Sequence, residues 1–260
     1  MPWLDYVFVK NPMRAKLFGA QTGPVARFAR DRLNERLTQN EKTSTFSKQP
    51  KDFLTRFLEA KVTHPDIVDD KQVFSYTVTN MFAGSDTTAI SLRAVLYYTL
   101  KNPPVLSRLN EELSVAFEAG NLSFPVTWKQ SQSLPYLDAV IKEALRLHPA
   151  VGLPLERLAP SSGLQLPNGP FLPAGTIVGA SPWIIHRDKN TFGSDANEFN
   201  PDRWLKKKGE TEAEFKNRER AMVRATFTFG AGSRTWIGRN VSLLEIYKVI
   251  PSLFWRYEVS

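Results

Sequence analysis

The chain has 260 residues, of which 42% are hydrophobic, and this is enough to form the core of one large domain or two small ones. It contains no cysteine, which excludes disulfides, zinc–thiolate sites and cysteine nucleophiles. The formal charge of +8 comes from scattered basic residues whose densest runs are diluted with Glu. This pattern favours a solvated face over a phosphate-binding stripe, so we expect no nucleic-acid partner.

The first half of the chain is predicted to be helical. Apolar residues at helical spacing predict a helix over 23–37, and the polar stretch 38–51 is typical of a loop. A short amphipathic helix is predicted over 52–61, and a long helix over about 70–101, closed by the prolines of "NPP". No stretch reaches the roughly 18 uninterrupted apolar residues that a membrane span needs.

The second half adds a minor β part. A helix ending at Gly120 and a helix over about 134–148 are predicted first. Prolines and glycines then punctuate short β-prone pieces in 151–179, which suit small hairpins. The stretch 183–204 has no clear period and is predicted to be ordered but irregular. A glycine-rich loop over 227–240 leads into a closing helix, so the predicted fold is mainly α.

The long predicted helix is interrupted by the motif "MFAGSDTT". Gly84, an acid and two threonines each weaken a helix interior. They are consistent with a tolerated kink. They are also consistent with a widened turn that faces a ligand, with Asp86 and Thr87 as a proton-relay pair.

The motif "KEALRLHP" places Glu143 and Arg146 three residues apart, on one face of a helix, where they can form an ion pair. Such a pair usually lies on the surface. Here the flanking residues are apolar, which indicates burial, and a buried pair needs further partners. Arg203, in "FNPDRW", is a candidate for the third member of this network.

The loop "FTFGAGSRTWIGRN" contains Gly230, Gly232 and Gly238, and glycines at this density allow a close approach to the backbone. The loop lacks the Gly-Lys-Ser/Thr ending of a P-loop. It also has Thr235 where a dinucleotide-binding motif has its third glycine. We therefore expect no nucleotide at this loop.

Taken together, these motifs resemble the cytochrome P450 haem-thiolate monooxygenases in their fungal microsomal form. "AGSDTT" resembles the oxygen-activation segment, "EALR" the Glu-x-x-Arg of the K helix, and "NPDRW" the segment with the partner arginine. "FGAGSRTWIGRN" matches the haem-binding loop at every fixed position but one. The resemblance runs from about Gly23 to the C-terminus. It implies the C-terminal, haem-facing portion of the P450 fold, as one partial domain over residues 1–260.

The resemblance implies haem as the cofactor, a lipophilic small molecule as the substrate and a flavoprotein reductase as the redox partner. It also implies a role in secondary metabolism and a family usually bound to the endoplasmic-reticulum membrane. Arg157 and Arg234 would pair with the haem propionates. The implied haem-contacting residues are Ala83, Gly84, Arg157, Phe229, Gly230, Gly232, Arg234, Trp236 and Gly238, and the implied substrate-pocket residues are Val151, Gly152, Leu153 and Pro154.

The one mismatch falls on the iron ligand, because Trp236 stands where the family has its cysteine. A thiolate pushes electron density onto the iron, whereas indole offers only an N–H donor. The chain is also about half as long as is usual in the family, and half a pocket would expose apolar surface. Two functions therefore stay open: a haem monooxygenase, or an inactive relic or non-catalytic binding protein that holds haem weakly.

Overall fold

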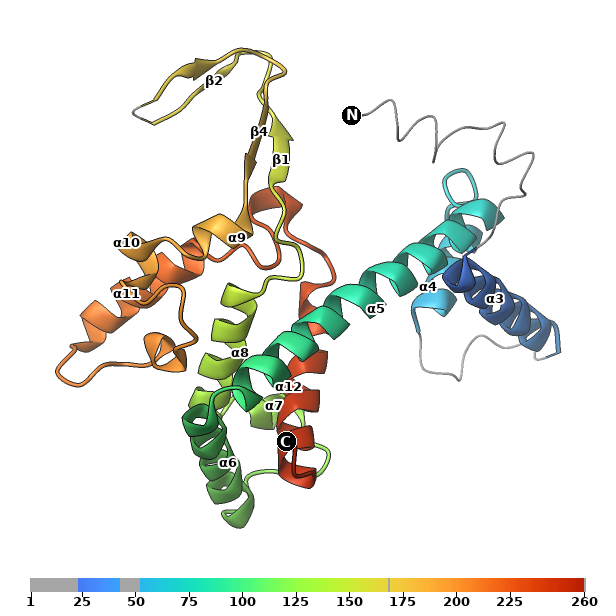
Figure 1. The fold of residues 1–260 in the computed structure, drawn as a ribbon. Coiled ribbons are helices and arrows are strands. Elements are labelled where there is room, and N and C mark those ends of the chain that lie inside the picture. Colours follow the sequence, from blue (N-terminus) through green and yellow to red (C-terminus); the bar gives the residue numbers. More distant parts are fainter. Residues whose placement is uncertain (1–22, 43–51, 168, 260) are drawn as a thin grey trace. The chain divides into compact units, whose positions relative to one another are not determined.

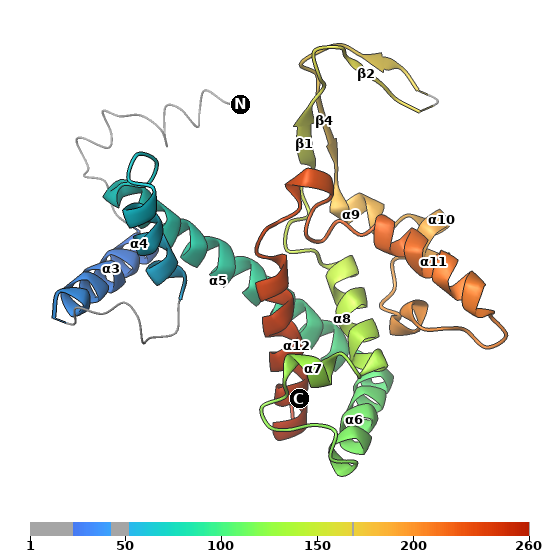
Figure 2. The ribbon, with the colours of Figure 1, turned by 180° about the vertical axis from the view of Figure 1, so that it is seen from behind.

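The computed structural model describes residues 23–42, 52–167 and 169–259, which form mainly helices with two small antiparallel sheets (Figures 1 and 2). The mainly α architecture expected from the sequence is confirmed. The chain divides into two compact units, Met1–Ser85 and Asp86–Ser260, and each is described by itself. The long helix α5 supplies its first half to the first unit and its second half to the second.

The elements keep the labels of Figure 1. The helices, in chain order, are α3 (Pro24–Lys42), α4 (Phe53–Thr63), α5 (Asp70–Leu100), α6 (Pro103–Glu118), α7 (Trp128–Ser131), α8 (Pro135–Leu147), α9 (Pro182–Ile185), α10 (Lys189–Phe192), η1 (Pro201–Trp204), α11 (Glu212–Arg224), η2 (Gly232–Arg234) and α12 (Arg239–Arg256). The strands are β1 (Leu155–Leu158), β2 (Leu164–Gln165), β3 (Phe171–Leu172) and β4 (Ile177–Ala180).

The first unit has a small core in which Leu58, Val68 and Val73 are buried. Asp52 caps α4 by accepting a 2.8 Å hydrogen bond from the Thr55 amide. Helix α3 is longer than predicted. It continues to Lys42, through residues that were predicted to begin a loop, and the rest of that predicted loop lies outside the described residues.

The core of the second unit is built around α8. Helices α6, α8 and α12 lie side by side with the end of α5 (Figures 1 and 2). Leu109, Leu137, Ile141 and Ile246 are buried where they meet. Glu112 of α6 also binds the first amides of α8, and burial raises the pKa of its carboxyl. Helix α8 is thus held in place by apolar packing and by the Glu112 carboxylate, which accepts hydrogen bonds from the amides at its N-terminus.

The β part consists of two hairpin-like sheets. Strand β1 pairs antiparallel with β4, and β2 pairs antiparallel with β3. Gly163 has φ +74°, and a Cβ added there would lie 2.1 Å from the Phe171 ring, so only glycine fits. The hairpins expected from prolines and glycines in 151–179 are therefore present.

The stretch 183–204 was predicted to be irregular, and this was partly wrong. It contains single-turn helices, α10 and η1, and most of α9. The side chains of Asp188 and Asn200 cap two of them. A helix of one turn has no hydrophobic period, which is why periodicity did not reveal these helices.

Helix α11 was not predicted either. Its sequence is dominated by charged residues, with only one buried side chain, Met222, so it lacks an apolar stripe. A local signal was present, however. Thr211 and Glu214 form a capping box, in which each side chain binds the backbone N–H of the other residue.

Helix α5 is α-helical without interruption from Asp70 to Leu100, so the widened turn considered for "MFAGSDTT" is not formed. A Cβ added at Gly84 would meet nothing within 4 Å. Among the described residues, no helix is both long enough and apolar enough to cross a membrane.

Candidate functional site

An ion network lies at the centre of the second unit. Glu143 and Arg146 of α8 are fully buried, and their side chains pair through contacts of 2.7 and 2.8 Å. Arg203 of η1 approaches the same carboxylate at 3.2 Å, and the Trp204 indole donates to it at 2.9 Å. Every charge in this network has hydrogen-bonding partners, which is what makes its burial tolerable.

The guanidinium of Arg146 also reaches beyond the carboxylate. It donates to the backbone carbonyls of His186, Ala196 and Glu198 at 2.5, 2.6 and 3.1 Å. These carbonyls belong to the irregular stretch that follows β4. Arg146 therefore ties three points of this segment, which is built of single turns, to helix α8.

Arg203 extends the network to Asp195, whose carboxylate lies 2.9 Å from its guanidinium. Burial alone would raise the pKa of Asp195. Hydrogen bonds from Asn200 and Arg203 and the charge of Arg203 outweigh burial and lower this pKa below its usual range. The network thus continues through Asp195, which is only partly buried, toward the surface.

His186 joins this network to the glycine loop. Its ring is fully buried, with Nδ1 2.8 Å from the Arg146 carbonyl oxygen and Nε2 2.7 Å from the Phe227 amide nitrogen. Because Nε2 accepts the amide hydrogen, the ring proton lies on Nδ1 and points to the carbonyl. Burial lowers the pKa of His186 to about 4, so the ring is neutral at pH 7.

The loop itself makes a tight reversal. Gly230 and Gly232 have φ values of +78° and +65°, a region that disfavours residues with a Cβ. The Trp236 amide closes the reversal by donating to the Phe229 carbonyl at 2.8 Å. At the start of the loop, the Thr228 hydroxyl donates to the Leu145 carbonyl on α8.

The indole of Trp236 is half-buried and lies against the loop's own chain. Its ring stacks on Phe229 with centroids 6.0 Å apart and an interplanar angle of 15°. A Cβ added at Gly238 would lie only 2.7 Å from the Trp236 Cζ2 atom. Between these two residues, Ile237 is almost completely exposed, at 98%.

The motif on α5 is divided between the two units. Ala83 and Gly84 belong to the first unit, whereas Asp86 and Thr87 belong to the second. In the second unit, Asp86 is exposed and Thr87 is half-buried. Their neighbour Thr88 is buried and shares a 2.8 Å hydrogen bond with Ser242 of α12, the helix that follows the loop.

The two arginines implied as propionate partners are both exposed. Arg157 lies on β1 and donates to the adjacent Glu156 carbonyl, and Arg234 ends η2. Within the described part of the chain, no carboxylate pairs with either guanidinium. The implied substrate-pocket segment, Val151–Pro154, is also open, with Leu153 76% exposed.

The donor set does not fit thiolate-ligated haem. The loop backbone and the two unpaired guanidiniums suit a flat dianionic ring. However, the Trp236 indole has no lone pair for iron, and both ring nitrogens of His186 are hydrogen-bonded. Over residues 23–42, 52–167 and 169–259, no group of three or more His, Cys, Asp or Glu side chains is arranged to hold a metal ion.

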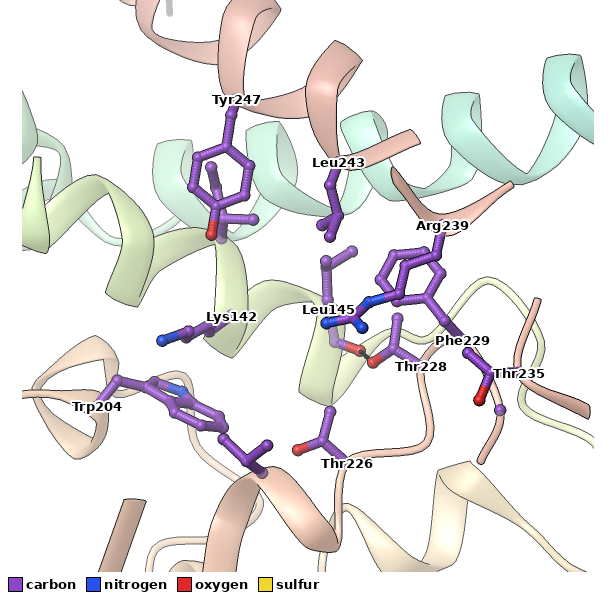
Figure 3. A pocket seen from close by; sticks show the side chains of 13 residues that line it. Lys142, Leu145, Trp204, Thr226, Thr228, Phe229, Thr235, Arg239, Leu243 and Tyr247 are labelled. Carbon is purple, nitrogen blue, oxygen red and sulfur yellow. Dashed lines mark hydrogen bonds between the residues drawn. The ribbon is translucent and has the colours of Figure 1, made fainter. Parts of the chain in front are cut away.

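A pocket of about 290 Å³ lies between the loop, α8, α12 and the end of α11 (Figure 3). Apolar and aromatic side chains form most of its wall, and two cationic side chains also line it. The lining residues are Ile141, Lys142, Leu145, Trp204, Val223, Thr226, Thr228, Phe229, Gly230, Thr235, Arg239, Leu243 and Tyr247.

Three contributors to the site were not predicted from the sequence. His186, Thr88 and Ser242 bind partners that are remote in sequence. Thr88 lies in the "MFAGSDTT" motif, but nothing in the motif indicates its bond to Ser242. A weak signal did exist for His186, because a histidine in an irregular stretch needs partners for both ring nitrogens if it is buried.

Comparison with known proteins points to a single family, the one that the sequence motifs resemble. The family model for cytochrome P450 matches residues 2–260. The chain is 45% identical to a cytochrome P450 monooxygenase of Aspergillus terreus and 43% identical to the cytochrome P450 monooxygenase cicH of Emericella nidulans. It is 38% identical to the cytochrome P450 monooxygenase cfoH of Aspergillus candidus. These matches cover 99–100% of this chain and 46–51% of the relatives, so the chain spans about half of their length.

Proposed function

Because the chain belongs to the cytochrome P450 family, we propose that it serves haem-dependent oxidation of a lipophilic small molecule in fungal secondary metabolism. The observation that carries this proposal is the connection from the Glu143–Arg146–Arg203 network through His186 to the glycine loop. These buried contacts fix the start of the glycine loop, which favours a function that depends on the position of the loop backbone.

Haem bound through a thiolate would supply an electron-rich iron that favours cleavage of the O–O bond, but this chain has no thiolate to bind it. The residues proposed to hold haem include Arg157 and Arg234, through the propionates, and the backbone of the glycine loop. Asp86 and Thr87 are the proposed proton-relay pair, and 151–154 is the proposed substrate-contacting segment. A flavoprotein reductase is the proposed electron donor.

Trp236 favours a second candidate function, that of a catalytically silent member of the family. The indole cannot replace the thiolate, and it already packs on Phe229 and over Gly238. In this form the chain keeps the helices and the buried network. It would bind a small molecule or a partner without transferring oxygen.

One experiment separates the two candidates. The purified chain, Trp236→Cys and Trp236→Ser are each mixed with haem, reduced under carbon monoxide, and examined by absorbance spectroscopy. Thiolate ligation shifts the Soret band of the carbon-monoxide complex far to the red. The serine variant is the matched control, because it removes the indole without supplying a thiolate.

We expect no red-shifted band from the parent or from Trp236→Ser, and a partial band from Trp236→Cys. The recovery is partial because Leu153 and Ile237 remain exposed beside the site, which leaves bound haem poorly enclosed. A parent without the band favours the silent form for the chain as it stands. A band from Trp236→Cys would show that Trp236 alone prevents thiolate ligation, and if Trp236→Cys gives no band either, the monooxygenase proposal fails for the fold as well. A red-shifted band from the parent would contradict the conclusion that a chain with Trp236 at this position cannot bind haem as a thiolate-ligated enzyme does.

A further inference from the structure

The pocket behind the glycine loop has an apolar body with a polar end. Leu145, Leu243, Val223 and Phe229 supply apolar wall from α8, α12, α11 and the loop. Figure 3 shows Arg239 pointing into this space from α12, whereas the amine of Lys142, on α8, lies over the Trp204 ring and points away from Arg239. Its volume of about 290 Å³ is just below the range of pockets that hold drug-sized molecules, so it suits a smaller ligand.

The polar groups of the pocket favour a ligand that accepts hydrogen bonds. The hydroxyls of Thr226, Thr228 and Thr235 already donate to backbone carbonyls, at 2.8, 3.3 and 2.9 Å, so they offer only lone pairs to a ligand. The donors that remain are the side chains of Lys142 and Arg239.

The two cations are not equivalent. Lys142 is bound to Asp138 at 2.7 Å and lies 3.6 Å from Glu219, so its charge is largely balanced. Arg239 has no carboxylate partner within the part of the chain that the structure describes. A guanidinium binds a carboxylate through two parallel hydrogen bonds, which makes Arg239 the natural anchor for an anionic head group.

We propose that this pocket binds a small amphipathic carboxylate. The carboxylate binds Arg239, and a short apolar body packs against Leu145, Leu243 and Phe229. The proposal goes beyond the oxidation proposed above and needs no haem, so it stands or falls independently of that function.

The test compares three probes with the same eight-carbon body and different heads: octanoate, 1-octanol and octylammonium. Binding to the haem-free chain is measured by isothermal titration calorimetry, below the micellar concentration of each probe. A charge-assisted hydrogen bond makes octanoate bind about ten- to a hundredfold more tightly than octanol. Octylammonium is expected to bind most weakly, because the Arg239 guanidinium repels its ammonium head.

Four variants locate the site. Arg239→Gln is expected to reduce octanoate affinity to that of octanol, and Arg239→Lys to restore part of the preference. Arg256→Gln removes the same charge from the same helix, roughly 25 Å away along its axis, and should change nothing. Val223→Trp places an indole at a half-exposed wall position and should abolish binding of both octanoate and octanol.

The proposal is overturned if octanol or octylammonium binds as tightly as octanoate, or if octanoate gives no heat at millimolar concentration. It is equally overturned if Arg239→Gln retains the parent's octanoate affinity while its circular dichroism spectrum is unchanged. Arg239 is exposed and holds no buried partner, so loss of the fold would not account for a changed affinity.

Discussion

The backbone amide of Phe227 donates a 2.7 Å hydrogen bond to Nε2 of His186, which lies 41 positions earlier in the chain. The other ring nitrogen faces the Arg146 carbonyl at 2.8 Å. One buried imidazole therefore fixes the start of the glycine loop to helix α8. It does so only while it is neutral, because a protonated ring has two donors and cannot accept from the amide.

This requirement makes stability depend on pH. Burial lowers the folded-state pKa of His186 to about 4, below its ordinary value of 6.5. The stability from the neutral ring is therefore fully present above pH 6.5 and is lost as the pH falls toward 4. We expect the parent to lose about 3 kcal/mol from this group across that window, measured by urea unfolding at each pH.

The variant His186→Gln provides the comparison for that pH series. Glutamine does not titrate, so its stability curve should fall less steeply than the parent's between pH 6.5 and pH 4, although its stability at neutral pH is lower. Parallel curves for the two proteins would show that His186 is not the titrating group.

The buried ion network should be far more sensitive to mutation than exposed pairs are. Arg146→Ala leaves the Glu143 carboxylate buried without its main partner, and we expect a loss of about 3–5 kcal/mol in the free energy of unfolding. The control is Lys216→Ala, which removes an exposed pair with Glu212 and should cost no more than about 1 kcal/mol. Equal losses in urea unfolding would refute the assigned role of the network.

The contact between Trp236 and Gly238 predicts that Gly238→Ala has opposite effects on stability in the parent and in Trp236→Cys. In the parent, Gly238→Ala forces a Cβ to 2.7 Å from the indole and should destabilise the chain by about 1–3 kcal/mol. In the Trp236→Cys background the clash is gone, and φ at position 238 is −77°, which alanine accepts. There, Gly238→Ala should stabilise by about 0.4–1 kcal/mol. A double-mutant cycle measures the difference, and purely additive effects would show that the indole does not rest on Gly238.

The helices of the core could be predicted because their apolar residues repeat at helical spacing. This holds for α6, α8 and α12, which bury a face against one another. Helical spacing of apolar residues did not predict α11, because this helix is mostly charged and has no apolar stripe. The capping box at Thr211 and Glu214 was the available signal and was missed. Helical spacing also failed in 183–204, where single-turn helices have no period.

The sequence predicted some of the residues of the site, but not the contacts that join residues remote in sequence. The spacing of Glu143 and Arg146 indicated a pair, and the apolar flanks indicated burial. The role of His186 could not be predicted, because its two partners come from α8 and from the loop, about 40 residues away on either side. The position of the Trp236 indole likewise depends on a ring, Phe229, that becomes its neighbour only when the loop reverses.

The contacts of Arg146 also set an order of assembly. Its carboxylate partner, Glu143, is one turn away, whereas the carbonyls of His186, Ala196 and Glu198 are 40, 50 and 52 residues distant. Local contacts close small loops and form early in folding, and remote ones form later. We therefore expect the segment after β4 to dock onto an α8 that has already formed. Weakening these remote contacts should then speed unfolding and leave the folding rate nearly unchanged.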